Sequence, residues 1–495
     1  MYFMGIDVGT SSVKVLVMDE YGNIKASVSQ AYPIFYPRPD WAEQNPEDWW
    51  KATKQCINKM LSMFDIDAGD IKAVGVTGQM HGLVLMDSDN NLIRPAILWN
   101  DQRTKSECEY IIEKVGRENL SELTGNTAFT GFTAPKILWV RNNEEYSYKK
   151  ISHILLPKDY IRYKLSDEFA TDVSDASGTL LFDVEHRTWS LDMLRLLDIP
   201  LSWLPESYES SQAVGCITKK AAADTGLNEG TLVVAGGGDQ ACGAIGTGTV
   251  NDGVISVSLG TSGVVFASRD SYSVDKLNRL HTFCHADKRW YVMGVMLSAA
   301  SCLKWWVENN SPYNVDELLN MASNSKIGGN RLIFLPYMMG ERTPYSDPCA
   351  RGCLIGLNML HTRGDITRAI MEGVAYGLRD SFEIIKSMEI PINEVRLSGG
   401  GSNSRLWRQI ISDVFDTKVG IVNTLEGPSY GAAILSAVGY GYYDNVEQAC
   451  RSLINVRETV SPIKNNVDIY NDLYSIFTGL YRSLKDTFAD ISALS

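Results

Sequence analysis

The six residues VGTSSV at positions 8–13 return as LGTSGV at positions 259–264. Each copy joins two runs rich in β-branched residues, which cover positions 5–18 in the first half of the chain and 254–266 in the second. A glycine and hydroxyl residues between two such runs predict a strand, a tight turn and a second strand. Because this unit occurs twice, the sequence predicts a duplicated protein whose two halves open with the same hairpin.

The rest of the chain indicates two domains of mixed α/β type. Its 495 residues exceed what one hydrophobic core usually organises. Asn45, Pro46 and the acidic pair 47–48 are the start signals of a helix whose apolar residues recur as far as Phe64. Hairpins that alternate with amphipathic helices are typical of an α/β protein. We expect an N-terminal domain over 1–246 and a C-terminal domain over 247–495.

Charge and composition argue against several kinds of partner. The chain holds 46 basic and 59 acidic residues, a formal net charge of −13, so it would repel nucleic acid and anionic membranes. The N-terminus lacks signal-peptide features, and the longest uncharged stretch, 427–443, suits a buried helix better than a membrane span. Nine scattered cysteines are typical of free thiols in a reducing compartment. We therefore expect a cytoplasmic protein.

The two Gly-Thr-Ser turns are candidate phosphate sites, because such turns expose several backbone N–H groups. Many of them only connect strands, but two copies that open two domains favour the phosphate site. The residues concerned are Gly9, Thr10, Ser11 and Ser12 in the first copy, and Gly260, Thr261 and Ser262 in the second. Asp7 in the first copy corresponds to Ser258 in the second. A carboxylate beside bound phosphate needs a cation between them, so we expect Asp7 to bind Mg²⁺, directly or through water.

Asp239 follows three glycines at 236–238, directly after an apolar run. The glycines would let a substrate approach closely, so that Asp239 could accept a proton from a hydroxyl group as a general base. An equally open interpretation is that Asp239 caps a helix that begins at Gln240. The spacing GGGDQA also fits the fingerprint of a dinucleotide-binding dehydrogenase, but no convincing βαβ unit surrounds it and its aspartate would face the pyrophosphate.

A second glycine-rich loop, Gly399, Gly400 and Gly401 followed by Asn403, lies between an apolar strand and a helical stretch at 405–414. Such a loop allows a base or a ribose to approach closely, although an ordinary helix entry is the alternative. The chain has neither the G-x-x-x-x-G-K-[ST] motif nor the motifs of protein kinases. The sequence therefore excludes a P-loop enzyme.

Two polar segments are candidate sugar contacts. Residues 78–82 (GQMHG) follow an apolar strand and include His81, which could bind a sugar hydroxyl or lie in a core; taken alone, the core is the better interpretation. Residues 99–103 (WNDQR) combine one aromatic face with amide and charged groups. Sugar sites often combine these elements, and so do ordinary loops.

Together these motifs resemble the FGGY carbohydrate kinases, a branch of the actin–hexokinase superfamily of ATPases. Residues 5–11 and 259–263 are similar to the two phosphate loops of the family, and the similarity covers essentially the whole chain. Two longer family patterns also match, one at Gly131, Thr133, Lys136, Trp139 and Asn143, the other at Gly352, Gly356, Leu357, Ala369 and Glu372. The resemblance implies a duplicated, two-domain actin-like (ribonuclease H-like) fold with the active site in the interdomain cleft.

Within the family, several stretches are similar to the members that phosphorylate D-xylulose. They are residues 41–47, 79–82, 96–101, 131–136, 155–160, 236–240 and 340–344. This similarity implies an enzyme that uses ATP and Mg²⁺ to form D-xylulose 5-phosphate. Gln240 stands where some of these members carry Asn; both amides can hold sugar hydroxyls, and the longer side chain leaves the ketose preference open.

The resemblance also implies a role for each candidate residue. Asp239 is the catalytic base, Asp7 is the metal-site carboxylate, and residues 399–403 bound the adenosine pocket. The expected sugar contacts are Met80, His81, Trp99, Asp101, Asp239 and Gln240. The terminal hydroxyl of the sugar would face Asp239 while the two turns hold the ATP phosphates, and closure of the domains would exclude water.

Other functions remain open from the sequence alone. Ribulose, L-xylulose and similar substrates differ from D-xylulose only in the placement of hydroxyl groups. A non-catalytic sugar or nucleotide sensor, or an actin-like filament protein, would be a different class, although intact Asp7 and Asp239 argue against a lost catalyst. A homodimer is the default assembly for an enzyme of this size.

Overall fold

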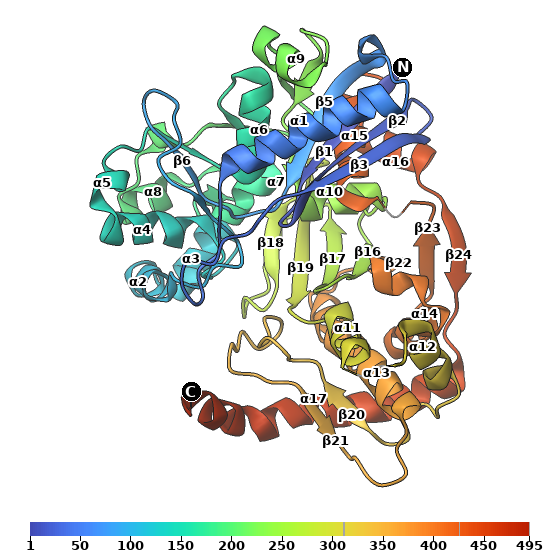
Figure 1. The fold of residues 1–495 in the computed structure, drawn as a ribbon. Coiled ribbons are helices and arrows are strands. Elements are labelled where there is room, and N and C mark those ends of the chain that lie inside the picture. The colour runs from blue at the N-terminus through green and yellow to red at the C-terminus, as the bar shows by residue number, and fades with distance from the viewer. Residues whose placement is uncertain (310–311, 425, 495) are drawn as a thin grey trace.

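Each half of the chain is built on its own sheet (Figure 1). The computed structural model describes residues 1–309, 312–424 and 426–494, and within these residues each main sheet has seven strands. The first sheet contains β1 (Tyr2–Val8), β2 (Ser12–Asp19), β3 (Ile24–Ala31), β5 (Ile71–Gly78), β13 (Ala213–Cys216), β14 (Leu232–Val234) and β15 (Gly237–Gly238). The second contains β16 (Val254–Leu259), β17 (Gly263–Arg269), β18 (His281–Cys284), β19 (Trp290–Met296), β22 (Glu394–Ser398), β23 (Val419–Val422) and β24 (Val456–Val460).

The predicted duplication is confirmed by the order of the strands. In the first sheet, β1 pairs antiparallel with β2 and parallel with β5, whereas in the second β16 pairs antiparallel with β17 and parallel with β22. Both hairpins close on the predicted turns, with Val8 opposite Val13 and Leu259 opposite Gly263. One outer strand enters by a different route: β13 precedes its partner β14, but β24 follows β23. Thus the central strands pair in the same way in both sheets, and the two sheets differ in the chain order of their outer strands.

Helices surround the two sheets, and the first begins where the sequence predicts. Asn45 precedes α1 as its N-cap and accepts a hydrogen bond from the Glu47 N–H at 3.1 Å. The helices of the first half are α1 (Pro46–Met63), α2 (Lys105–Val115), α3 (Arg117–Thr124), α4 (Thr133–Asn143), α5 (Glu145–Tyr148), α6 (Pro157–Ser166), α7 (Val173–Ala176), α8 (Leu191–Leu197), α9 (Lys219–Thr225) and α10 (Asp239–Gly246). Those of the second are α11 (Ala300–Glu308), α12 (Val315–Ser323), α13 (Arg363–Ser387), α14 (Arg405–Phe415), α15 (Gly427–Gly439), α16 (Val446–Leu453) and α17 (Lys464–Ala493).

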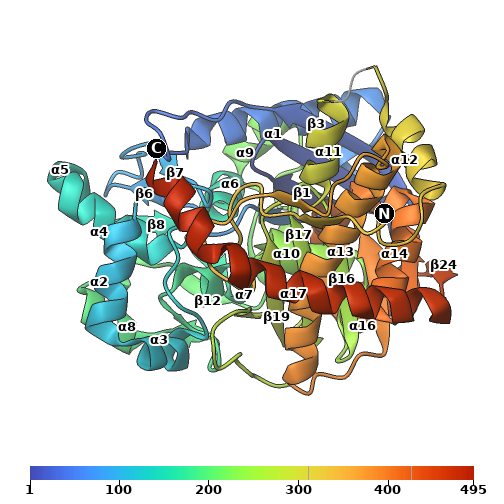
Figure 2. The ribbon, with the colours of Figure 1, turned by 90° about the horizontal axis from the view of Figure 1, so that it is seen from below.

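Smaller strand pairs complete both halves. They are β4 (Glu43–Gln44) with β7 (Ala96–Ile97), β6 (Val84–Met86) with β8 (His153–Leu155), β9 (Ala170–Asp172) with β12 (Glu206–Tyr208), β10 (Phe182–Asp183) with β11 (Thr188–Trp189), and β20 (Ile333–Leu335) with β21 (Cys353–Ile355). The long helix α17 crosses the underside of the second half (Figure 2). Its buried side chains Tyr470, Phe477 and Tyr481 join the core of that half.

Helix α15 lies in the second half of the sequence but packs on the sheet of the first half. Its backbone is so close that a Cβ atom on Gly5 of β1 would lie 1.9 Å from the Ser429 carbonyl oxygen, and one on Gly75 of β5 would lie 2.2 Å from that of Ala432. Helix α10 packs against α15 in the same way, since a Cβ atom on Gly431 would lie 1.9 Å from the Cys242 carbonyl oxygen. The two halves therefore meet at a seam where backbone contacts backbone.

Two further expectations concern cysteines and membrane spans. The nine cysteines, all within the described residues, are free thiols, as predicted. Across 1–309, 312–424 and 426–494, none of the helices is both long enough and apolar enough to cross a membrane. The uncharged stretch 427–443 forms the buried helix α15 over most of its length, also as predicted.

Candidate active site

Asp7 lies near the end of β1, one residue before the first Gly-Thr-Ser turn begins at Val8. The turn is closed by a hydrogen bond from the Gly9 N–H to the Ser12 carbonyl oxygen at 3.1 Å. Burial raises the pKa of Asp7 to about 6, against the opposing charge of Lys14. Its Oδ1 atom is buried and accepts no hydrogen bond from the described residues. An unpartnered carboxylate oxygen of this kind fits a cation ligand.

Asp239 is the first residue of α10. The expectation that it caps a helix beginning at Gln240 is wrong, because the helix begins one residue earlier and Gly238 occupies the N-cap position. Burial, and next the charge of Asp7, raise the pKa of Asp239 to about 7, although hydrogen bonds from the backbone and side chain of Gln240 oppose the shift. The Gln240 Nε2 atom lies 3.3 Å from Asp239 Oδ1. The two carboxylates predicted from sequence are thus electrostatic neighbours.

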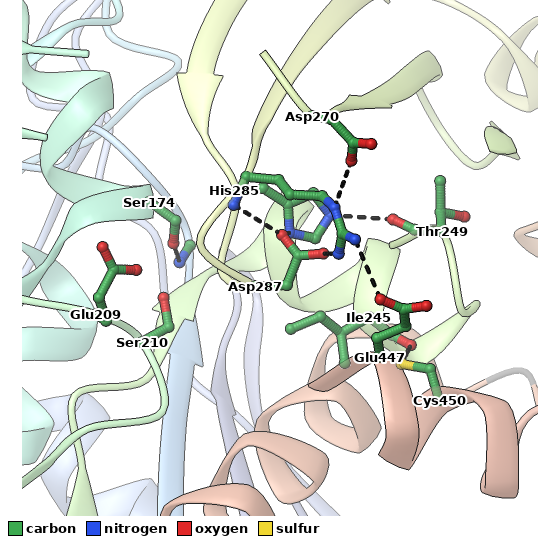
Figure 3. A network of polar contacts seen from close by, with 12 residues as sticks. Ser174, Glu209, Ser210, Ile245, Thr249, Asp270, His285, Asp287, Glu447 and Cys450 are labelled. Atoms are coloured by element: carbon green, nitrogen blue, oxygen red, sulfur yellow. Dashed lines mark hydrogen bonds and ion pairs between the residues drawn. The ribbon is translucent and has the colours of Figure 1, made fainter. Parts of the chain in front are cut away.

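The glycines before Asp239 are held by hydrogen bonds to a buried group of side chains that the sequence did not predict. The Gly238 N–H donates to Ser174 Oγ at 3.0 Å, and Ser174 Oγ donates to Asp172 Oδ2 at 2.5 Å. Ser210 donates to the same oxygen at 2.7 Å, and the ammonium group of Lys158 lies 2.9 Å from Asp172 Oδ1. Ser174 and Ser210 appear together in Figure 3. This buried network fixes the start of α10.

The far end of α10 is fixed by a second network, shown in Figure 3. His285 Nε2 donates to the carbonyl oxygen of Thr249, just beyond the helix, at 3.0 Å, and its Nδ1 lies 3.1 Å from Asp287 Oδ1. Arg289 then joins Asp287 (3.1 Å) to Glu447 of α16 (3.1 Å). Because both ends of α10 are anchored, Asp239 is held on a rigid element.

His81 is buried and adopts an unusual backbone conformation, with φ +67°. Burial lowers the pKa of His81 to about 3, so the ring is neutral. Its Nδ1 atom lies 2.6 Å from the Gly178 carbonyl oxygen, which can only accept; Nδ1 therefore carries the hydrogen and Nε2 remains an acceptor. Met80 packs beside the glycines that precede Asp239, since a Cβ atom on Gly238 would lie 3.0 Å from Met80 Cγ.

Lys136 holds His81 from behind. It is fully buried, and its ammonium group donates to the carbonyl oxygens of His81 at 2.9 Å and Gly131 at 2.6 Å. Thr133 adds a third hydrogen bond, from Oγ1 to the His81 carbonyl oxygen at 3.1 Å. Burial lowers the pKa of Lys136 to about 7, while the charge of Asp101 opposes that shift. The sequence signal for Lys136 was its place in a family pattern, but the contact with His81 was not predictable.

Trp99 and Asp101 occupy different environments. Trp99 is half-buried and its Nε1–H donates to Thr10 Oγ1 in the first turn at 2.9 Å. Asp101 is fully buried, and its Oδ2 accepts from the Ala42 N–H and from Arg103 Nη2, each at 2.7 Å. Trp99 thus adjoins the phosphate turn, whereas the Asp101 carboxylate is already occupied by protein donors.

The second Gly-Thr-Ser turn is packed against the glycine-rich loop. The Ala300 N–H donates to the Gly260 carbonyl oxygen and the Ala299 N–H to that of Thr261, each at 2.9 Å. Gly399 has φ +80°, and a Cβ atom there would lie 2.7 Å from the carbonyl carbon of Leu259. Gly400, by contrast, has no atom within 4 Å of its Cβ position. This loop is therefore closely packed against the turn at Gly399, whereas no protein atom packs against it at Gly400.

The remaining residues of the loop form a short helical turn. Gly401 lies within it, and a Cβ atom there would lie 2.9 Å from Leu259 Cβ. Asn403 is exposed at its end, and α14 begins two residues later, as the sequence predicts. Ser11 is exposed at the tip of the first turn, and Ser262 is half-buried in the second. The two turns and the loop thus present backbone and small polar groups at the ends of β1, β16 and β22.

A surface cavity of about 510 Å³ lies elsewhere in the first half. Trp50, Tyr160 and Tyr163 line it together with polar side chains, and none of the predicted site residues does. Among the residues that the structure describes, no group of three or more His, Cys, Asp or Glu side chains forms a metal site of its own. The cavity is therefore separate from the candidate site, which consists of Asp7, Asp239 and the glycine-rich turns.

Comparison with known proteins agrees with this geometry. Residues 2–246 match the family model described as the FGGY family of carbohydrate kinases, N-terminal domain, and residues 255–440 match the C-terminal domain of the same family. The chain is 38% identical over 487 residues to the xylulose kinase of Bacillus subtilis, covering 98% of this chain and 97% of that protein. It is 40% identical over 438 residues to the xylulose kinase of Escherichia coli, covering 88% and 90%.

A solved structure described as a xyloylose kinase from Brucella ovis superposes with a TM-score of 0.92 at 35% identity, covering 98% of this chain and 100% of that one. The xylulose kinase of Rhodospirillum rubrum gives a TM-score of 0.91 at 26% identity, covering 99% and 100%. The predicted two-domain kinase fold is therefore confirmed, and the dehydrogenase alternative is wrong. The chain belongs to the FGGY family of carbohydrate kinases.

Proposed function

We propose that this kinase transfers the γ-phosphoryl group of ATP to the terminal hydroxyl of D-xylulose, giving ADP and D-xylulose 5-phosphate. The observation that carries the proposal is Asp239, whose pKa is raised to about 7 beside Asp7 at the start of a rigid helix. The relatives named as xylulose kinases, whose stretches resemble those of this chain, support D-xylulose as the sugar.

Asp239 supplies the base. A carboxylate with a pKa near neutrality both accepts a proton readily and is substantially ionised at physiological pH. As the sugar oxygen forms its bond to the γ-phosphorus, its O–H proton passes to Asp239 and the bond to the ADP oxygen breaks. Anchoring at both ends of α10 keeps the carboxylate in place during this step.

Asp7 would hold Mg²⁺ through its unpartnered Oδ1 atom. When bound, Mg²⁺ neutralises part of the charge on the ATP phosphates. Asp7 itself raises the pKa of Asp239, so the two carboxylates are coupled. A cation shared with ATP phosphates needs only one or two protein carboxylates, which suits Asp7.

The sugar contacts that we propose are Met80, His81, Trp99 and Gln240, together with the base. His81 Nε2 is free to accept a hydrogen bond from a sugar hydroxyl, because Nδ1–H is engaged by Gly178. Asp101 stays a predicted sugar contact; both its oxygens accept hydrogen bonds from Arg103, so it also supports the loop that carries Trp99.

The proposed ATP site combines the two turns with residues 399–403. Gly9, Thr10, Ser11 and Ser12 would contact the phosphates from one half, and Gly260, Thr261 and Ser262 from the other. Gly399, Gly400, Gly401 and Asn403 would bound the adenosine, with the open face at Gly400 available for the base or ribose. Closing the two halves on the sugar would exclude water from the reacting phosphate.

The test is an ADP-release assay with ATP and Mg²⁺ against ketoses, aldoses and polyols, with Asp239→Asn as the catalytic control. We expect D-xylulose to give the highest kcat/KM and Asp239→Asn to lose roughly 10²–10⁴-fold of it while retaining nucleotide binding. Preference for ribulose or L-xylulose would keep the chemistry and change the substrate. Ligand binding without turnover of any sugar would favour a non-catalytic sensor. The cytoplasmic location and a homodimer stay predictions, checked by fractionation and sedimentation.

A further inference from the structure

Arg342 lies in the second half of the chain on a loop whose sequence, 340–344, has no role in the reaction described so far. Within the described residues, no carboxylate or carbonyl oxygen accepts a hydrogen bond from its guanidinium; the contact it makes is with the ring of Phe129, 5.6 Å from the guanidinium carbon. The side chain is half-buried, and burial lowers the pKa of Arg342. The charge of the neighbouring Glu341 opposes that shift, and arginine stays charged in proteins. Guanidinium N–H groups that donate to no protein oxygen are available to donate to a bound ligand.

The loop holds Arg342 rigidly from both sides. Glu341 Oε1 accepts hydrogen bonds from the Leu297 N–H at 3.0 Å and the Arg342 N–H at 2.7 Å. On the other side, Thr343 is paired with Val295 of β19 through bonds of 3.0 and 3.1 Å. A loop that merely exposed its arginine to water would not need this support, whereas a binding group benefits from it.

The guanidinium faces the sugar side of the first half. A Cβ atom on Gly131 would lie 3.9 Å from Arg342 Nη2 and 2.6 Å from the Trp99 carbonyl oxygen, so Arg342 approaches the backbone that carries Trp99. Its charge also lowers the pKa of His81. Arg342 is therefore near the backbone of Trp99, one of the proposed sugar contacts.

We propose that Arg342 is a substrate contact, whose guanidinium donates hydrogen bonds to sugar oxygens other than the hydroxyl that Asp239 activates. The proposal rests on the proposed function, because it names a further residue of the same sugar site. The chemistry is complementary: His81 Nε2 accepts from a hydroxyl, whereas arginine can only donate. A carbonyl oxygen, which accepts but cannot donate, would be bound by Arg342 and not by the neutral His81 ring. Arg342 and His81 together thus select a ketose, because one binds an accepting carbonyl oxygen and the other a donating hydroxyl.

The contact also joins the two halves. Arg342 belongs to the second half and Gly131, Trp99 and His81 to the first. A sugar that bridges them would stabilise the arrangement in which both halves approach, so that sugar binding favours the state in which the two phosphate turns act together.

The experiment compares Arg342→Met and Arg342→Lys with the wild type, using whichever sugar the wild type phosphorylates best. Arg351→Met is the matched control, because Arg351 lies in the same region and donates to the carbonyl oxygens of Pro348 and Ala350, each at 2.8 Å. We expect Arg342→Met to raise the Kd and KM for the sugar roughly 10- to 100-fold while the KM for ATP changes less than about threefold. Arg342→Lys should recover part of the loss.

Analogues of the sugar that each lack one oxygen, either a hydroxyl or the carbonyl oxygen, identify the contacted oxygen. For one analogue, the Kd of the wild type should rise by about the same factor by which Arg342→Met raises the Kd for the full sugar. The Kd of Arg342→Met should be the same for that analogue and for the full sugar. Folding is checked by melting temperature, and Arg342→Lys keeps the test valid if Arg342→Met is unstable. An unchanged sugar Kd, or equal changes in the KM for sugar and ATP, would overturn the role of Arg342 alone. No phosphorylation of any sugar by the wild type would overturn the proposed function together with it.

Discussion

The two halves of this kinase build the same frame and place different chemistry on it. Asp7 and Thr77 are paired across β1 and β5, and Ser258 and Ser398 are paired at the corresponding place in β16 and β22. The carboxylate therefore occurs once. In each half a glycine then follows the parallel strand closely: a Cβ atom on Gly78 would lie 2.8 Å from the Val8 carbonyl oxygen, and one on Gly399 would lie 2.8 Å from that of Leu259.

This correspondence relates two loops that look unrelated in sequence. After Gly78 and Gln79 the first half continues with Met80 and His81, which we assign to the sugar, and after Gly399 the second half continues with two more glycines, which we assign to the nucleotide. The first loop presents side chains, whereas the second presents open backbone. With these assignments, we propose that the repeated strand-and-turn frame positions a ligand in each half, and that the residues after the glycine decide which ligand binds there.

The largest difference between the two halves should appear when Asp7, the carboxylate that corresponds to Ser258 in the second half, is replaced. Asp7→Asn should lower kcat by roughly 10²–10³-fold and raise the Mg²⁺ concentration needed for half-maximal rate, because the unpartnered carboxylate is lost. Ser258→Ala, the matched change in the second copy, should alter kcat less than about twofold. The measurement is the initial rate over a magnesium titration. Comparable losses in both variants would mean that the two turns share the metal role.

A smaller effect should separate the tight and open sides of the glycine-rich loop. Gly399→Ala places a methyl group at φ +80° and 2.7 Å from Leu259, and should destabilise the fold by on the order of 1–2 kcal/mol and raise the KM for ATP. Gly400→Ala meets no atom within 4 Å, so stability should change by less than about 0.5 kcal/mol while the KM for ATP rises. Denaturant unfolding and ATP kinetics on both variants provide the test. If Gly400→Ala leaves ATP binding unchanged, the nucleotide lies elsewhere.

The smallest expected effect is a pH-dependent gain in stability. The folded-state pKa values of Asp239 and Asp7 are raised, so between about pH 4 and pH 7 the folded state binds more protons than the unfolded state and loses stability as the pH rises. Asp239→Asn removes the part of this loss that comes from Asp239. Without divalent cations, the variant should melt roughly 2–4 °C above the wild type at pH 8 and close to it at pH 5. A difference in melting temperature that is the same at both pH values would show that the pKa of Asp239 is not raised in the folded state.

The sequence predicted the strand–turn–strand units and the first helix well, because the residues that indicate them are close together in the chain. The strand–turn–strand units, the start of α1 and the carboxylate at Asp7 each depend on a few neighbouring residues. The residues that it missed act over long distances: Ser174 binds Gly238 from 64 positions away, and Lys136 binds the His81 carbonyl from 55 positions away. Nothing near Asp239 distinguishes a helix cap from the first helical residue, so that alternative needed the structure.

The placement of α15 has a consequence for how the polypeptide can be divided. A fragment that ends at residue 246, where the N-terminal family match stops, would lack the helix whose backbone covers Gly5 and Gly75, and would expose that face of its sheet to water. The remaining piece would carry α15 without the surface it fits. Chimeras between relatives should therefore transfer residues 427–439 together with residues 1–246, as one unit that residues 247–426 interrupt in the sequence.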